Sequence, residues 1–192
     1  MGNQVPVIIG VDEVGRGCWA GPLLVVAARA KANLPSGVKD SKRLSKKQRL
    51  DLYEKLLASC DFGAGWVSAR ELDKLGLSRS LTVGAKRALS QLKAASNDRI
   101  TLDGKHNYLP GIFTEVNAYP KADSLEPIVS AASIYAKVLR DNYMVKLSKR
   151  YLGYYFERHV GYGTGLHREA ILKLGVIEGV HRQSYKPIAE LL

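Results

Sequence analysis

The chain has 192 residues and a mass of 21.1 kDa, which is long enough for one domain with a substantial core and short for two. Its 46% hydrophobic and 24% charged residues are typical of a soluble globular protein and exclude wholesale disorder, a collagen-like repeat and a coiled-coil rod. Its 29 Lys and Arg residues against 18 Asp and Glu residues leave a net charge of +11, which favours a polyanionic partner, either nucleic acid or an acidic membrane surface.

The first predicted elements are two strands that pair like a hairpin. Val5–Val11 is rich in β-branched residues and ends at Asp12-Glu13, and Pro22–Ala28 is a second apolar run. The glycine-rich stretch between them indicates a turn. Residues 15–20 match the G-x-G-x-x-A pattern of dinucleotide-binding folds, but that fold needs a helix next, and here a strand follows. A dinucleotide site is therefore disfavoured.

The rest of the chain mixes helical patterns with one further strand. Apolar residues recur at helical spacing in Ser45–Ser59 and Ser78–Ser96, and again in Ser124–Arg150, a long helix with a proline in its first turn. Arg99–Leu102 is a short strand that leads into Asp103-Gly104. This order predicts an α/β or α+β sheet domain spanning residues 1–192, in which residues 151–192 form a small C-terminal helical subdomain.

The cysteines and the apolar runs indicate a cytoplasmic protein. Cys18 and Cys60 are far apart and form no C-x-x-C pair, so a reduced compartment is expected. No signal peptide is visible, and the longest apolar run, Leu23–Ala28, is too short to span a bilayer. Because no basic amphipathic helix carries bulky apolar anchors, nucleic acid is favoured over a membrane surface.

Acidic residues follow two apolar strands. Asp12 and Glu13 end the first, and Asp103 ends the strand that begins at Arg99. Burying a carboxylate costs free energy unless a positive charge offsets it. The alternative interpretation is that these acids lie at strand ends exposed to water and have no special role. Two strand ends that each deliver a carboxylate predict a site for Mg²⁺ or Mn²⁺, which prefer oxygen ligands.

Strand geometry limits what the acidic pair can do. Adjacent side chains of a strand point to opposite faces, so we expect the strand to break at Glu13, or Glu13 to contribute through its backbone carbonyl. Asp123 is a third candidate ligand, and the alternative is that it or Ser124 caps the long helix. The histidines lack metal-type spacing and are expected to pack or to bind other polar groups: His106, His159, His167 and His181.

Two loops are candidates for contacts with nucleic acid. Asp40–Leu44 is a polar loop before a predicted helix, where a phosphate can bind the helix N-terminus. Tyr162 lies in the glycine-rich segment Gly161–Gly165 and can stack on a base or sugar, unless it merely packs.

Seven blocks of the chain, in order, resemble the ribonuclease HII family. They are Asp12–Gly17 with Ala20–Pro22; Asp40–Lys42 with Leu44; Asp103-Gly104; Lys121–Asp123; Ser130–Ile134 with Ala136–Val138 and Arg140-Asp141; Gly161–Thr164 with His167; and His181-Arg182 with Ser184-Tyr185 and Pro187. The blocks cover nearly the whole chain. Three positions depart from the commoner pattern: Cys18-Trp19, Val160 in place of a frequent Lys, and Tyr185 in place of the usual Phe.

The resemblance implies a ribonuclease H-like fold, a mixed sheet flanked by helices with a small C-terminal helical subdomain. It implies a monomeric endonuclease that uses two metal ions, Mg²⁺ or Mn²⁺. Such an enzyme cuts the RNA strand of RNA–DNA hybrids and duplex DNA at single ribonucleotides, leaving 3′-hydroxyl and 5′-phosphate ends. Two alternatives are a non-catalytic binder of the same duplexes, which would gain nothing from the acids, and a resolvase- or transposase-like DNA nuclease, which needs no reader of the 2′-hydroxyl.

The resemblance also implies a role for each candidate site residue. The catalytic and metal-binding acids are Asp12, Glu13, Asp103 and Asp123. The backbone of Gly15, Arg16 and Gly17 would contact the ribose 2′-hydroxyl, and Tyr162 would stack on the adjoining deoxyribose. Further substrate contacts are expected from Ser41, Lys42 and Lys137.

Overall fold

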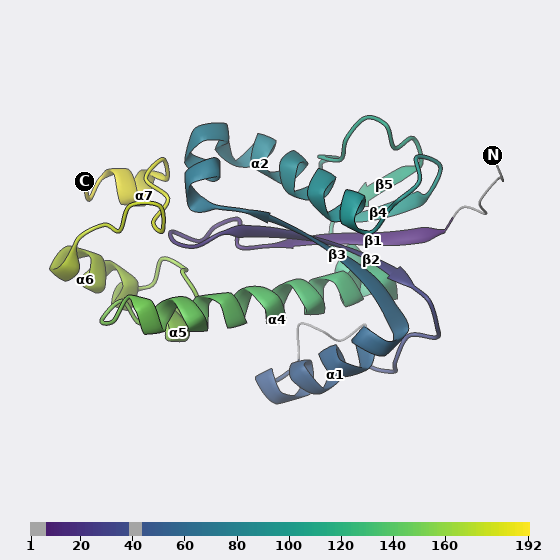
Figure 1. Ribbon diagram of the computed structural model, residues 1–192, viewed down its shortest axis with the longest axis horizontal. Coiled ribbons are helices and arrows are strands. Elements are labelled where there is room, and N and C mark those ends of the chain that lie inside the picture. The colour runs from purple at the N-terminus through teal and green to yellow at the C-terminus, as the bar shows by residue number, and fades with distance from the viewer. Residues whose placement is uncertain (1–6, 39–43) are drawn as a thin grey trace.

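One mixed sheet of five strands runs through the molecule in the order β3-β2-β1-β4-β5 (Figure 1). The computed structural model describes residues 7–38 and 44–192. Its strands are β1 (Ile8–Val14), β2 (Leu23–Ala30), β3 (Cys60–Val67), β4 (Arg99–Asp103) and β5 (Val116–Tyr119). β1 pairs antiparallel with β2 and parallel with β4, so the predicted hairpin is confirmed and β1 is a central strand.

Helices cover both faces of the sheet, as the α/β prediction requires. Ile9 and Val11 of β1 pack toward α2 (Ala69–Gln91), whereas Leu24 and Val26 of β2 pack toward α1 (Lys46–Ser59) and α4 (Pro127–Arg150). Figure 1 shows α2 on one side of the sheet and α1 with α4 on the other. Because side chains alternate along a strand, this arrangement assigns every β1 residue to one of two faces.

Serine caps and a proline set the starts of these helices. Ser45 forms a capping box with Gln48 at the start of α1. Ser68 forms another at α2, whose first part runs from Ala69 to a kink at Gly76; the helix predicted for Ser78–Ser96 corresponds to the part after this kink and ends at Gln91. The apolar spacing missed this early start because Gly76 leaves the helical conformation and interrupts the pattern.

Two strands and one short helix were not predicted. β3 contains three polar or glycine positions among its apolar ones, and β5 has only four residues, so neither shows a clear strand pattern. The predicted helix Ser124–Arg150 is divided into α3 (Ala122–Leu125) and α4, which are separated at Glu126. None of the helices in the described part of the chain is long and apolar enough to cross a membrane.

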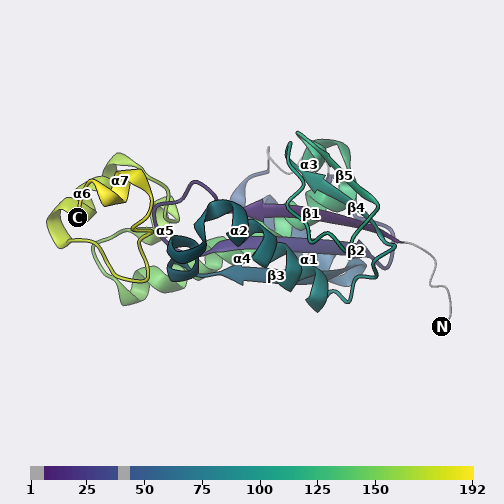
Figure 2. The same cartoon turned by 90° about the horizontal axis from the view of Figure 1, so that it is seen from above.

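Residues 151–192 form a helical region at the end of the sheet where β1 leads into β2 (Figure 2). Its helices are α5 (Phe156–His159), α6 (Gly165–Leu174) and α7 (Lys186–Ala189). They share a hydrophobic cluster that includes Phe156, Ile171 and Ile188 and also Ala20, from the turn between β1 and β2. The C-terminal region is therefore packed directly against that glycine-rich turn.

Candidate active site

Asp12 and Asp103 lie side by side at the carboxyl ends of two parallel strands. Val11 of β1 pairs with Leu102 of β4, so Asp12 and Asp103 come next in the same register and face α4. Asp12 is only 7% exposed. Burial, reinforced by the charges of Glu13 and, to a smaller extent, Asp103, raises the pKa of Asp12 to about 8, although a hydrogen bond with Ser133 opposes the shift. The pair is thus a site of negative charge that lacks sufficient compensation.

Glu13 lies on the opposite face of the sheet. β1 stays regular to its end, with Glu13 paired to Val25 of β2, so the predicted break at Glu13 is wrong. Continuous pairing with β2 keeps the strand extended through this position. The Glu13 carboxylate accepts hydrogen bonds from Arg16 Nη1 at 3.0 Å and from the Tyr108 hydroxyl at 2.7 Å. A contribution through the Glu13 carbonyl stays a prediction.

Asp123 is placed next to Asp103 by the start of α3. The backbone N–H of Ala122 donates to Asp103 Oδ1 at 2.8 Å, and Asp123 follows directly and is 2% exposed. The helix-cap alternative is wrong for both residues considered, since the residue before α3 is Lys121 and the residue before α4 is Glu126. Instead, the carbonyl of Asp123 accepts a hydrogen bond from the Ser130 hydroxyl.

The four acids are therefore only partly brought together. Asp12 and Asp103 share a face, Asp123 adjoins Asp103, and Glu13 points to the other side of β1. Among residues 7–38 and 44–192, no group of three or more acidic, histidine or cysteine side chains is arranged to hold a metal ion.

The turn between β1 and β2, residues 15–22, is here called the glycine loop. Gly15 has φ of 90°, and a Cβ there would collide with the buried guanidinium of Arg140, so only glycine fits. Gly17 differs, because it is exposed and no protein atom lies within 4 Å of the position of a Cβ. The loop thus has a tightly packed start and an open edge at Arg16 and Gly17.

Two arginines with 0% exposure hold the glycine loop in place. Arg140 donates to the carbonyls of Pro22 at 2.9 Å and Ala20 at 3.1 Å. Arg182, from the C-terminal region, donates to the carbonyls of Gly21 and Arg16, both at 3.0 Å. Both arginines belong to blocks noted in the sequence, but nothing there indicated that they bind this loop.

Tyr162 lies next to the glycine loop, whereas Lys137 lies on α4. The backbone N–H groups of Trp19 and Ala20 donate to the carbonyl of Gly161 at 2.8 and 3.2 Å, so the two loops pair. Tyr162 is 40% exposed, and Lys137 forms an ion pair with Asp141 at 2.7 Å. Ser41 and Lys42 lie outside the described residues.

Three of the four histidines form a buried group, here called the histidine cluster. His159 and His167 stack with ring centroids 4.3 Å apart, and His167 Nε2 lies 3.2 Å from His181 Nε2. The remaining ring nitrogens have backbone partners, including the carbonyl of Tyr162 at 2.9 Å from His167. Burial lowers the pKa of both His167 and His181 to about 4. The expected polar role is confirmed, but their mutual contact was not predicted.

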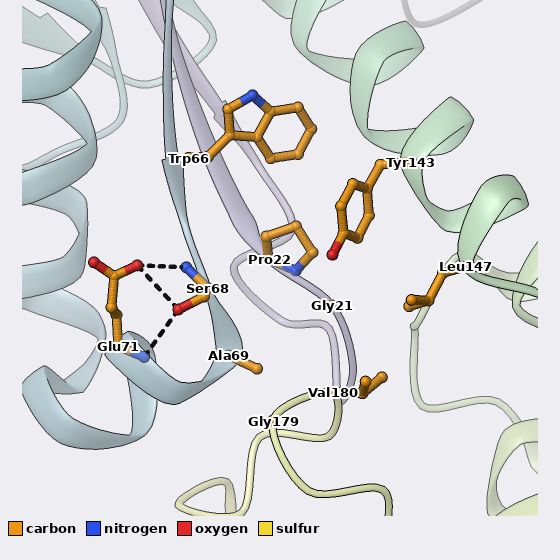
Figure 3. A pocket seen from close by; sticks show the side chains of 10 residues that line it. All are labelled: Gly21, Pro22, Trp66, Ser68, Ala69, Glu71, Tyr143, Leu147, Gly179 and Val180. Atoms are coloured by element: carbon orange, nitrogen blue, oxygen red, sulfur yellow. Dashed lines mark hydrogen bonds between the residues drawn. The ribbon is translucent and has the colours of Figure 1, made fainter. Parts of the chain in front are cut away.

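Two cavities are lined in part by residues of the glycine loop. One, of about 500 Å³, is lined by Pro22, Trp66 and Tyr143 and by none of the four acids (Figure 3). The other, of about 460 Å³, is lined by Arg16, Asp103 and Tyr108. The second cavity therefore adjoins Asp103 but none of the other three acids, and residues of α2 line its other side.

Sequence reasoning missed two side chains that contact the acids. Ser133 lies on α4, opposite Asp12, within a block that resembled a family motif but carried no assigned role. Tyr108 is separated from Glu13 by 95 positions, and no local pattern links them. Only the pairing of β1 with β4 brings the loop after β4 to this face.

Comparisons with known proteins agree over nearly the whole chain. The family model described as Ribonuclease HII matches residues 9–188. Ribonuclease HII of Coxiella burnetii is 38% identical over 187 residues, which cover 96% of this chain and 91% of that protein. Ribonuclease HII of Thermus thermophilus is 42% identical over 189 residues, with coverages of 96% and 88%.

Solved structures show the same mixed sheet flanked by helices. The chain matches Archaeoglobus fulgidus ribonuclease HII, solved in a complex with PCNA, with a TM-score of 0.78 and 27% identity, covering 96% of each chain. It matches Pyrococcus horikoshii ribonuclease H2 with a TM-score of 0.73 and 26% identity, again covering 96% of each. The expected ribonuclease H-like fold is thus confirmed.

Proposed function

Because the chain belongs to the ribonuclease HII family of metal-dependent endonucleases, which act on RNA–DNA hybrids, we propose that it also cuts duplex DNA at single embedded ribonucleotides. In the proposed reaction the oxygen of a water molecule bonds to phosphorus and the bond from phosphorus to O3′ breaks. The products are a 5′-phosphate and a 3′-hydroxyl. The enzyme is proposed to act as a monomer in the cytoplasm.

The observation that carries this proposal is the position of Asp12 and Asp103, one residue beyond the last residues of β1 and β4 that pair with each other. Their oxygens are ligands that Mg²⁺ and Mn²⁺ prefer, and the pKa of Asp12 is raised by burial and by neighbouring negative charge that a cation would offset. We propose that these two acids, with Asp123 and Glu13, hold the divalent ions. When bound, two such ions activate the attacking water and stabilise the leaving oxygen.

The open edge of the glycine loop supports recognition of the ribose. A 2′-hydroxyl both donates and accepts hydrogen bonds, so backbone groups can read it only at close range. Gly17 is exposed and offers no side chain in the way, and its neighbour Arg16 is tied to Glu13. Tyr162 lies on the loop that pairs with this one and is proposed to stack on the next sugar.

Three duplexes test the proposal: all-DNA, the same DNA with one ribonucleotide, and an RNA–DNA hybrid. We expect the second and third to be cut, and only with Mg²⁺ or Mn²⁺. Tight binding without cleavage would support the non-catalytic alternative, and cleavage of the all-DNA duplex would support a resolvase-like nuclease. Full activity in excess chelator would contradict the metal assignment.

The substitution Gly17→Ala tests the 2′-hydroxyl reader without disturbing the fold. The added methyl group meets no protein atom, so the melting temperature should stay within about 2 °C, whereas cleavage at a single ribonucleotide should fall about tenfold. Gly111→Ala is a matched control, since Gly111 is also exposed with open space around it. Wild-type cleavage by a folded Gly17→Ala variant would exclude this edge as the reader.

A further inference from the structure

The backbone carbonyl of Arg16, in the glycine loop, accepts hydrogen bonds from two side chains of the C-terminal region. Arg182 Nη1 donates to it at 3.0 Å, and the Tyr185 hydroxyl donates to it at 2.7 Å. Arg182 Nη1 also donates to the Tyr185 hydroxyl at 3.1 Å, so the three groups form a closed triangle. A carbonyl oxygen has two lone pairs, and here both have a donor. The direction of the Arg16 carbonyl is therefore fixed from two sides.

The segment that carries Tyr185 is anchored to the sheet domain. Asp73 of α2 accepts hydrogen bonds from the backbone N–H groups of Gln183 at 3.0 Å and Ser184 at 2.9 Å. The Tyr185 ring packs against the hydrophobic core between the sheet and α2, and the Arg182 guanidinium lies 5.2 Å from its centroid. These contacts hold the ring without its hydroxyl, so Tyr185→Phe should leave the ring in place.

The direction of the Arg16 carbonyl also sets the direction of the Gly17 N–H. Both groups belong to one planar trans peptide, in which C=O and N–H point in opposite directions. The carbonyl points to Arg182, which is fully buried, so the N–H of the exposed Gly17 points away from that arginine. No group among residues 7–38 and 44–192 accepts a hydrogen bond from this N–H. A backbone donor thus lies at the open edge of the glycine loop.

We propose that Tyr185 is a positioning residue that acts through the Arg16 carbonyl to aim the Gly17 N–H at the 2′-oxygen of the ribose. The inference rests on the proposed function, in which the backbone of the glycine loop reads the 2′-hydroxyl. Because both lone pairs of the Arg16 carbonyl are used, this peptide reads the ribose with its N–H, and the 2′-oxygen accepts the hydrogen bond. Phe at position 185 would leave only Arg182 to hold the carbonyl.

Fluorescence anisotropy with labelled duplexes tests the inference on the full chain, in chelator so that nothing is cut. The two probes are duplex DNA with one ribonucleotide and the same duplex without it. Tyr185→Phe removes only the hydroxyl, so we expect the ribonucleotide duplex to bind about three- to tenfold more weakly and the all-DNA duplex to change by less than about twofold. An equal loss on both duplexes, or no loss on either, would overturn the inference.

The Gly17 amide itself gives a signal that separates positioning from a general effect on structure. In ¹⁵N-resolved NMR spectra its proton resonance is assigned by its disappearance in Gly17→Ala. A new hydrogen bond should move this resonance further with the ribonucleotide duplex than with the all-DNA duplex, and Tyr185→Phe should reduce the difference. Equal movement with both duplexes in the wild-type protein would contradict the proposed direction of the N–H.

Tyr154→Phe is a matched control from the same region. The Tyr154 hydroxyl also donates to a backbone carbonyl, that of Gly175 at 2.8 Å, which is outside the glycine loop. Its loss should lower the melting temperature and leave the preference for the ribonucleotide duplex within about twofold of wild type. If this variant loses as much preference as Tyr185→Phe, the effect belongs to stability and the inference is wrong.

The outcome does not depend on cleavage. A wild-type protein that prefers the ribonucleotide duplex but cuts no duplex with Mg²⁺ or Mn²⁺ would refute the proposed activity, while the comparison of affinities would still decide the role of Tyr185. A wild-type protein that binds both duplexes equally would overturn the reader of the 2′-hydroxyl and this inference together.

Discussion

Two groups of buried polar side chains flank the glycine loop, and burial shifts their pKa values in opposite directions. In the acid site, burial and neighbouring negative charge raise the pKa of Asp12 to about 8. In the histidine cluster, burial lowers the pKa of His167 and His181 to about 4. Both shifts favour the neutral form, because a buried charge is costly in either case.

The two groups differ in whether the protein supplies the missing partners. Each histidine ring nitrogen lies within hydrogen-bonding distance of a backbone group or another ring, so the cluster is satisfied when all three rings are neutral. Asp12 and Asp103 instead lie side by side, and the hydrogen bond between Asp12 and Ser133 offsets only part of the cost of burial and like charge. A satisfied group stabilises the fold, whereas an unsatisfied charged group indicates a ligand. Substitutions in the two groups should therefore have opposite effects on stability.

The largest expected effect is that of Asp12→Asn. Loss of the charge removes a metal ligand, so cleavage should fall about a thousandfold or more. The same change removes the cost of burying the charge and relieves repulsion, so the free energy of unfolding of the metal-free protein at pH 8 should rise by several kcal/mol. Cleavage kinetics and chemical denaturation in chelator measure both. A less stable metal-free variant would contradict the comparison.

The histidine cluster should respond in the opposite direction. The substitution His181→Leu leaves the Ile177 N–H and the His167 ring without partners, so the free energy of unfolding should fall by about 3 kcal/mol. His106→Ala is the control: this histidine is exposed, and its substitution should change the free energy of unfolding by less than about 0.5 kcal/mol. Equal stability of the two variants would show that the cluster contributes nothing.

The stability of the metal-free protein should depend on pH through both Asp12 and the histidine cluster. Folded Asp12 keeps its proton up to about pH 8, whereas an unfolded Asp loses it near its ordinary value of 3.8, so stability should fall as the pH rises between these values. Unfolded histidines take up protons near 6.5 and the buried ones only near 4, so stability should also fall as the pH drops through that window.

Each titrating group contributes a slope of about 1.4 kcal/mol per pH unit. Melting temperatures recorded in chelator from pH 4 to 9 measure the profile. Asp12→Asn should remove the fall on the alkaline side and leave the fall on the acidic side. If the substitution changes the melting temperature only at acidic pH, the assignment of the alkaline fall to Asp12 is wrong.

The smallest effect concerns Tyr162, which connects the two regions. Its carbonyl lies 2.9 Å from His167 Nδ1, while its ring is 40% exposed. Tyr162→Ala keeps the carbonyl, so the free energy of unfolding should change by less than about 1 kcal/mol while cleavage at a single ribonucleotide falls about tenfold. Tyr162→Phe should stay within about threefold of wild type if stacking dominates. A loss of stability without a loss of cleavage would assign the ring to the fold.

The sequence predicted best those features that depend on the type and spacing of neighbouring residues. Apolar runs identified β1, β2 and β4, and apolar residues at helical spacing after Ser45 identified α1. Carboxylates directly after apolar strands identified Asp12 and Asp103 as neighbours, because parallel strands deliver their ends to one edge. The family resemblance extended this reading to the fold, which the solved structures confirm.

The tertiary structure alone decided which side of the sheet each group occupies. Pairing with β2 kept β1 straight through Glu13, and so the side chain of Glu13 meets Tyr108 rather than Asp12. Packing of α4 and of the C-terminal region buried Arg140 and Arg182 against the glycine loop and gathered the histidines. These contacts join residues that are up to 166 positions apart, and no local pattern of residues records them. They arise from the packing of whole elements, whereas a sequence pattern records only the preferences of each element by itself.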